Sequence, residues 1–263
     1  MKPGDVICLS ASVPNREEWT EGSNPREIQE AIVSLARAVF SRGGRLLFGG
    51  HPSISPLIAD IAGEYYSADP TRKIRPIVTF QSKLYEGKLP DRTWLLFRMG
   101  WSAIEWTPNV SGDKKQSLEL MRRVMLGDDP PPEYEQVMAK HDLPPPLAMF
   151  TVGGMDGVRE EALMFLAARR KWSSNRNSKI FALTSGGGAS ARFFDPPYLW
   201  SDCLWPKESV PQLEELALTQ ALQSGDLVPL EQAWESAHPN SLSSEFPVKP
   251  YAAITQWVLD EVL

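Results

Sequence analysis

Hydrophobic residues along the first hundred positions follow two different spacings. Short apolar runs at 6–9, 45–48 and 74–80 are typical of buried strands. Between them, apolar residues three and four positions apart predict helices from Pro25 to Gly43 and from Ser55 to Tyr65, with Tyr65 on the inner side. Asn24 is the expected N-cap of the first helix, and Glu27 occupies the position of a capping-box acid. This alternation of strands and helices predicts a parallel sheet covered by helices.

The rest of the chain continues the pattern less regularly. Strands are expected at 94–97, 103–106, 148–152 and 179–183, and helices at 117–126, 134–140 and 158–170. Two surface helices are expected at 210–223 and 251–263. We therefore expect a single α/β domain over residues 1–263, with a Rossmann-like three-layer fold and a mostly parallel central sheet. A helical C-terminal extension covers about 205–263.

Charge and composition argue against a nucleic-acid-binding, membrane-spanning, disulfide-bonded or metal-binding protein. The chain has 33 Asp and Glu against 27 Lys and Arg, a net charge of −6, so nucleic acid is an unexpected partner. No apolar run is long enough to cross a membrane, and the N-terminus lacks the layout of a signal peptide. Cys8 in a strand and Cys203 in an aromatic loop do not suggest a disulfide, so we expect a cytoplasmic protein. No His or Cys spacing fits a metal site, and no cofactor is expected.

Small residues follow four of the expected strands. In a parallel sheet these turns meet at the carboxyl edge, where backbone N–H groups and helix N-termini can hold a phosphate. None matches the dinucleotide or P-loop fingerprint, which disfavours NAD-dependent redox chemistry and ATP hydrolysis. The candidate ligand-binding residues are Ser10, Ala11, Ser12, Gly49, Gly50, His51, Gly153, Gly154, Met155, Asp156, Gly157, Glu160, Ser185, Gly186, Gly187 and Arg192.

The sequence allows two alternative roles for several of these residues. His51 either bonds a sugar or phosphate or fixes the turn before Pro52, and Ser10 and Ser12 either donate to a phosphate or cap a turn. Arg192 either pairs with a phosphate or forms a surface salt bridge. The basic run 114–123 contains interleaved acids and is better explained as a solvated helix face than as a DNA groove. The tryptophans at 94, 101 and 106 fit packing better than stacking on a base.

The segments LSASVP, RLLFGGHPSISPLI, FTVGGMDGVREEALMF and FALTSGGGASARF resemble the SLOG superfamily, which joins the DprA/SMF proteins to the LOG enzymes and includes the sensor region of TRPM channels. The resemblance spans about residues 5–195 and is strongest to prokaryotic branches found beside TIR- and sirtuin-type defence and nucleotide-signalling modules. It implies a Rossmann-like fold and a ligand built from a nucleotide or ADP-ribose. A homodimer or higher homo-oligomer, and an effector protein encoded nearby, are the partners it suggests.

LOG enzymes cleave the N-glycosidic bond of nucleoside monophosphates with a PGGxGTxxE turn and a preceding Arg. Residues 157–161 resemble the end of this motif, which makes Glu161 the candidate catalytic carboxylate and Arg122, or Arg123, the candidate basic partner. The chain departs from the motif where Val152 replaces Pro and Val158 replaces Thr, and where one extra residue lies between Gly154 and Gly157. Acids in a first helical turn are also favourable through the helix dipole alone.

Two functions follow as hypotheses. The preferred one is a sensor that binds a nucleotide-derived signal, ADP-ribose-like or cyclic, in bacterial antiviral or stress signalling. The alternative is a LOG-like phosphoribohydrolase that uses Glu161 and an Arg. Because the changed motif weakens the case for catalysis, the sequence leaves enzyme activity undecided. DNA binding of the DprA kind needs a basic groove that the net charge does not favour.

Overall fold

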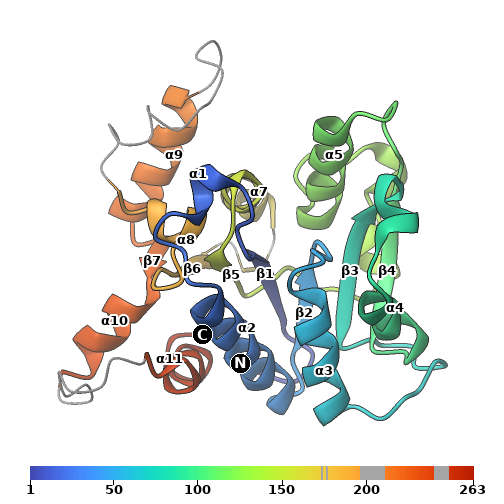
Figure 1. Cartoon of the computed structure of the whole chain (residues 1–263), viewed down its shortest axis with the longest axis horizontal. Coiled ribbons are helices and arrows are strands. Elements are labelled where there is room, and N and C mark those ends of the chain that lie inside the picture. Colours follow the sequence, from blue (N-terminus) through green and yellow to red (C-terminus); the bar gives the residue numbers. More distant parts are fainter. Residues whose placement is uncertain (173, 176, 196–210, 240–248) are drawn as a thin grey trace.

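Seven parallel strands form the central sheet of the computed structural model (Figure 1). The structure describes residues 1–172, 174–175, 177–195, 211–239 and 249–263, so Cys203 and Val210 lie outside the described part. The strand order is β4-β3-β2-β1-β5-β6-β7, and each neighbouring pair is parallel. The strands are β1 (Val6–Ser12), β2 (Arg45–Phe48), β3 (Ile77–Ser82), β4 (Ser102–Thr107), β5 (Ala148–Gly153), β6 (Lys179–Leu183) and β7 (Leu227–Pro229). The fold is Rossmann-like, as the sequence predicts.

Helices cover both faces of this sheet. Alternating β1 residues separate two cores: Ile7 and Leu9 pack in one, and Val6 and Cys8 in the other. The first face carries α2 (Pro25–Ser41), α3 (Ser55–Tyr65), α4 (Asp91–Arg98), α10 (Leu230–Ala237) and α11 (Tyr251–Trp257). The second carries α5 (Lys114–Leu126), α6 (Val137–Lys140), α7 (Asp156–Ala168), α8 (Gly188–Arg192) and α9 (Pro211–Gln223). Short turns α1 (Glu17–Thr20), η1 (Lys83–Lys88), η2 (Pro132–Tyr134), η3 (Arg169–Lys171) and η5 (Val258–Val262) complete the chain.

The expected start of α2 is confirmed by its capping contacts. The Asn24 side chain accepts hydrogen bonds from the N–H groups of Arg26 and Glu27, and Pro25 is the first residue of α2. Asp113 caps α5 in the same way through the N–H of Gln116, at 2.9 Å. Gly127 then ends α5 in the left-handed conformation that favours glycine, with φ of 69°.

Three of the sequence predictions about these elements are wrong. Trp94 to Phe97 lie in α4 and not in a strand. Within this helix, Leu96 is the residue of the four that is buried in the core. The helix expected at 134–140 is divided into η2 and α6. Tyr65 is 40 % exposed and does not belong to the inner side of α3. The three tryptophans do pack as expected: Trp101 is buried, and Trp94 lies against Trp106 with ring centroids 6.3 Å apart.

The C-terminal part is more integrated than two surface helices. β7 extends the sheet beside β6, and α10 follows it directly. Tyr251, Ile254 and Val258 are buried against the core that also contains α2. In Figure 1, α11 lies alongside α2 near both chain termini. The segment after residue 211 therefore completes the fold.

The direction of the chain reverses at β1. From β1 it proceeds through α2 on one face to β2, whereas β5, on the other side of β1, leads into α7 on the opposite face. At such a reversal, the connections from two adjacent strands lead to opposite faces of the sheet and leave a crevice at the carboxyl ends of these strands. Ligands of open α/β sheets bind in this crevice. This edge contains the ends of β1, β2 and β5.

Candidate functional site

Arg122 on α5 lies between two carboxylates of α7. Its Nε lies 3.3 Å from Oε1 of Glu161, and its Nη1 is bonded to Oε2 of Glu160. The side chains of Arg122 and Glu161 are only 12 % and 11 % exposed, whereas that of Glu160 is 27 % exposed. The two residues proposed as a catalytic pair are thus in contact, although 39 positions separate them in the sequence.

Glycines make room for this ion pair. A Cβ at Gly157 would collide with Nη2 of Arg122, so glycine at this position lets the guanidinium lie against the first turn of α7. A Cβ at Gly49 would lie 3.7 Å from Oε1 of Glu161, which places the end of β2 beside the same carboxylate. These glycines therefore bring α5, α7 and β2 together at the carboxyl edge.

Burial controls the ionisation of both carboxylates. It raises the pKa of Glu161, against the opposing charge of Arg122, and it raises the pKa of Glu160 in the same way. The Ser10 hydroxyl is fully buried and forms no hydrogen bond of good geometry among the described residues. It lies close enough to Glu161 to lower the pKa of that carboxyl in part. Carboxylates with raised pKa values beside a cation are typical of functional sites.

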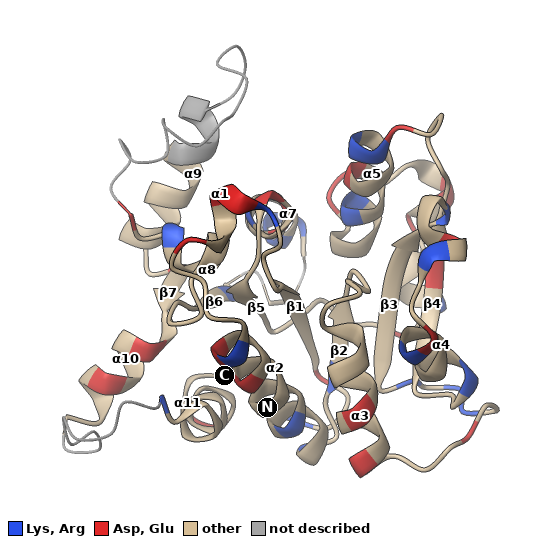
Figure 2. Ribbon diagram, viewed as in Figure 1, with Lys and Arg blue, Asp and Glu red and all other residues tan. Residues whose placement is uncertain are grey.

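His51 and Tyr85 surround the same cluster. Burial, together with the charges of Arg122 and Lys114, lowers the pKa of His51 to about 4. Burial raises the pKa of Tyr85, and the charge of Arg122 acts against this effect. Figure 2 shows basic residues at both ends of α5, and among them Lys114 and Lys115 are exposed near its N-terminus. The cluster consists of Ser10, Gly49, His51, Tyr85, Lys114, Arg122, Gly157, Glu160 and Glu161, and we call it the Arg122 cluster.

The turn after β2 is held by a side chain from the neighbouring strand β3. Gln81, at the end of β3, donates through Nε2 to the carbonyl oxygens of Gly49 and Gly50 at 3.3 and 3.4 Å. Gly50 has φ of 61°, and a Cβ there would lie 2.7 Å from Cγ2 of Thr79. Sequence reasoning missed Gln81 and Tyr85. Their position at and just after the end of β3 is the signal that could have identified them.

The turn after β5 is occupied by the protein itself. The N–H of Gly154 donates to the carbonyl oxygen of Ser12 at 2.8 Å, and a Cβ at Gly153 would lie 2.6 Å from Cδ1 of Ile28. Met155 and Asp156 are covered by Arg16, whose guanidinium contacts the Met155 sulfur at 3.4 Å and the Asp156 carboxylate. Ala11 is buried in the core of the first face. These residues make contacts within the chain, and of them Asp156 also acts on the cluster, because its charge contributes to the raised pKa of Glu160.

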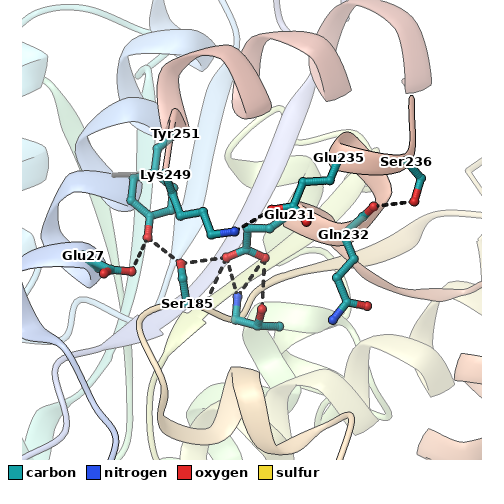
Figure 3. Close-up of polar contacts among 9 residues, drawn as sticks. Glu27, Ser185, Glu231, Gln232, Glu235, Ser236, Lys249 and Tyr251 are labelled. Carbon is teal, nitrogen blue, oxygen red and sulfur yellow. Dashed lines mark hydrogen bonds and ion pairs between the residues drawn. The ribbon is translucent and has the colours of Figure 1, made fainter. Parts of the chain in front are cut away.

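The turn after β6 is closed by a carboxylate from the C-terminal segment (Figure 3). Glu231, which is 2 % exposed, accepts hydrogen bonds from the N–H groups of Thr184 and Ser185 at 2.8 and 3.0 Å, and from both hydroxyls. The Tyr251 hydroxyl contacts Ser185 and donates to Glu27 at 2.8 Å. The backbone N–H of Ser185, which was expected to bind a ligand, is therefore already paired, as is that of Thr184. No local pattern could have indicated Glu231, because its partners lie 46 and 47 positions away.

The rest of this turn packs against the segment before α2. The carbonyl oxygen of Gly186 accepts from the N–H of Asn24 at 3.0 Å, and a Cβ at Gly187 would collide with the backbone of Gly22. The Arg192 guanidinium lies 4.3 Å from the centre of the Trp19 ring and donates to the carbonyl oxygen of Glu18 at 2.6 Å. Arg192 thus holds α1 over the end of β6. This arrangement leaves the Arg122 cluster as the part of the edge where the charged groups converge.

A comparison with family profiles matches residues 18–197 to the SLOG cluster3 family. The chain belongs to the SLOG cluster3 family. The match covers more than half of the chain and contains every member of the Arg122 cluster except Ser10. The segment that contributes Glu231 and Tyr251 lies beyond the match, so this SLOG protein closes its own β6 turn with residues outside the matched region.

Other comparisons add little to this assignment. No curated protein sequence matches the chain. Among solved structures, the X-ray structure of TM1055, a structural genomics target, aligns with 13 % identity and a TM-score of 0.42, covering 72 % of this chain and 79 % of that one. Within the described residues, no helix has both the length and the apolar character needed to cross a membrane. In the same part of the SLOG protein, no group of three or more His, Cys, Asp or Glu side chains is arranged to hold a metal ion.

Proposed function

We propose that this SLOG protein binds a small molecule derived from a nucleotide, ADP-ribose-like or cyclic, and acts as a sensor in bacterial antiviral or stress signalling. Membership of the SLOG cluster3 family supports the proposal. The single observation that carries it is the Arg122 cluster, in which a cation and two largely buried carboxylates meet at the carboxyl edge. A nearby effector protein and a second copy of the chain are the partners that we propose for such a sensor.

The charges of the cluster indicate how such a ligand would lie. Glu160 and Glu161 outnumber Arg122, so the centre of the cluster suits neutral hydroxyl donors of a ribose better than a bare phosphate. The exposed ammonium groups of Lys114 and Lys115 lie at the start of the same helix and suit a phosphate at the periphery. In this arrangement the sugar of the ligand contacts the two carboxylates, and its phosphate lies near the N-terminus of α5.

The occupied turns limit where the ligand can extend. The Glu231 carboxylate already accepts hydrogen bonds from the backbone amides of the β6 turn, and Arg192 holds α1 over the same end of the sheet. The proposed ligand therefore extends from the Arg122 cluster toward the ends of β2 and β3, where Gln81 fixes the glycine turn.

Calorimetry tests the binding function. Wild-type protein is titrated with a panel of ADP-ribose derivatives, cyclic nucleotides and nucleoside monophosphates, and we expect saturable binding of at least one. Absence of binding across the panel contradicts the proposal. Because binding could occur elsewhere on the chain, Glu161→Gln is titrated with the same panel, and Glu119→Gln on the exposed side of α5 serves as its control.

The contact between Arg122 and Glu161 also favours a second function, hydrolysis of a nucleotide N-glycosidic bond. In this reaction water adds to the ribose carbon while its bond to the base nitrogen breaks, and the base leaves with a proton. Glu161 would stabilise the positive charge on the sugar, and its raised pKa would suit proton transfer. Release of free base by the wild type, abolished in Glu161→Gln, is the expected result. If both proteins are equally inert, the hydrolase function is excluded and the binding function is not.

A further inference from the structure

The imidazole of His51 has a fixed orientation and a fixed tautomer. Its Nδ1 accepts a hydrogen bond from the backbone N–H of Ser53 at 3.2 Å. Because a backbone N–H can only donate, Nδ1 must carry a lone pair. The single proton of the neutral ring is therefore on Nε2.

A second donor reinforces this tautomer. The Ser53 hydroxyl lies 2.8 Å from Nδ1 and accepts a hydrogen bond from the N–H of Val13 at 3.0 Å. Since the Ser53 oxygen already accepts from Val13, its own hydrogen is available to donate to Nδ1. A relay thus runs from the end of β1, through Ser53, to the ring at the end of β2. Partners of this kind commonly set the orientation of a functional histidine.

The backbone of the turn holds the ring in place as well. The carbonyl oxygen of His51 accepts from the N–H groups of Ile54 and Ser55, at 3.1 and 3.0 Å, and from the Ser55 hydroxyl at 2.9 Å. The main chain and Nδ1 of His51 therefore fix the turn before Pro52, one of the two roles considered for this residue, while Nε2 takes no part in the turn.

The surroundings of the ring favour its neutral form. The charged groups that act on it, Arg122 and Lys114, are both cations of α5, and the groups on the Nδ1 side are the uncharged Ser53 and Val13. Protonation of Nδ1 would also break the hydrogen bond from the Ser53 amide. Among the described residues, Nε2 forms no hydrogen bond, so its N–H remains available to a ligand at the end of β2.

We propose that His51 is a ligand-binding residue that presents a neutral Nε2–H donor to an oxygen atom of the bound ligand, a role that rests on the proposed nucleotide-binding function. The oxygen is an acceptor on the sugar or the phosphate. A neutral donor beside Arg122 suits such an oxygen, because it adds a directed hydrogen bond without adding a second positive charge next to the guanidinium.

The tautomer can be tested without any ligand. Full-length protein labelled with ¹⁵N in its three histidines is examined by NMR between pH 5 and 8, and the His51 signals are assigned from their loss in His51→Gln. We expect the pattern of an Nε2-protonated neutral ring with no titration across this range. A ring that titrates near its ordinary pKa, or one protonated on Nδ1, overturns the inference whether or not a ligand binds.

The ligand role is tested with ADP-ribose as the probe. We expect His51→Ala to weaken its binding about three- to tenfold, as loss of one hydrogen bond does, and His51→Gln, which retains an N–H donor, to weaken it less. Ser53→Ala keeps the ring but removes one lock on its tautomer, and we expect an intermediate loss. His238→Ala, whose ring stacks on Trp234, is the control and leaves the affinity unchanged.

The outcomes separate the inference from the proposed function. Equal affinity of wild type and His51→Ala, with both proteins folded by circular dichroism, overturns the role of His51 while the binding function stands. If the wild type binds neither ADP-ribose nor any other member of the nucleotide panel, the binding function fails, and the ligand role of His51 fails with it.

Discussion

Nε of Arg122 lies 3.3 Å from Oε1 of Glu161, and the same guanidinium is bonded to Glu160. Removing the cation leaves two partly or largely buried carboxylates without the guanidinium that contacts both of them. We therefore expect Arg122→Gln to lower the free energy of unfolding by about 2–4 kcal/mol. Arg123→Gln is the matched control: Arg123 is 46 % exposed and pairs with Glu119 one turn earlier, so its loss should cost no more than about 0.5 kcal/mol. Urea titration measures both, and equal losses would contradict the structure of the cluster.

The Glu231 carboxylate supports the turn after β6. We expect Glu231→Ala to lower the free energy of unfolding by about 3 kcal/mol, because it leaves the N–H groups of Thr184 and Ser185 without their acceptor. Glu235 lies one turn further along α10 and pairs with Lys249, with its side chain 39 % exposed. Thermal melts of Glu231→Ala and Glu235→Ala compare the two positions, and we expect the second to change stability by no more than about 0.5 kcal/mol. Similar melting temperatures would show that Glu231 does not hold the turn.

Gly153 is required by packing as well as by backbone conformation. It has φ of 60°, and an added Cβ would lie 2.6 Å from Ile28 and 2.8 Å from the carbonyl oxygen of Ser12. Gly127 has a similar φ of 69°, but an added Cβ would meet nothing within 4 Å. We expect Gly127→Ala to cost about 1 kcal/mol from strain alone and Gly153→Ala about 3 kcal/mol. Chemical denaturation measures this difference, and an equal cost would mean that the β5 turn is looser than described.

His51 gives stability a defined pH dependence. Its pKa is lowered to about 4 in the folded protein, so between that value and the ordinary 6.5 the unfolded chain binds more protons. The contribution is therefore fully present above pH 6.5 and is lost as the pH falls toward 4, by at most about 3.4 kcal/mol. Glu160 and Glu161 have raised pKa values, and their contribution has the opposite sign.

Comparison with His51→Gln isolates the histidine from these carboxylates. The difference in unfolding free energy between the two proteins should change across pH 4–6.5 and remain constant above it. A constant difference over the whole range would show that the ring titrates alike in the folded and unfolded chains.

Much of the fold was predictable because its determinants are local. The strand predicted at 179–183 corresponds to β6, and α2 begins at Pro25 with Asn24 as its N-cap, as expected. The strand predicted at 94–97 failed because an apolar run of four residues does not distinguish a strand from one turn of helix, and Pro90 precedes a helix there. β7 was not predicted because it has only three residues. It pairs with β6 because α9 returns the chain to the edge of the sheet.

The candidate site was predictable in part. Resemblance to the SLOG family paired Arg122 with Glu161, and the structure brings them into contact. The glycine turns after β5 and β6 looked like ligand cradles because sequence alone cannot show what a glycine approaches. At Gly153 and Gly187 the close neighbours are Ile28 and Gly22 of the chain itself, and at Ser185 the bound carboxylate is Glu231.

Titration of paired variants tests the central claim most directly. The panel member that binds wild type most tightly is titrated calorimetrically into Arg122→Gln and Arg123→Gln, at a temperature where circular dichroism shows both variants folded. The account predicts that Arg122→Gln loses at least about tenfold in affinity, the equivalent of one charge-assisted contact, whereas Arg123→Gln binds as the wild type does. Unchanged binding by a folded Arg122→Gln would contradict it.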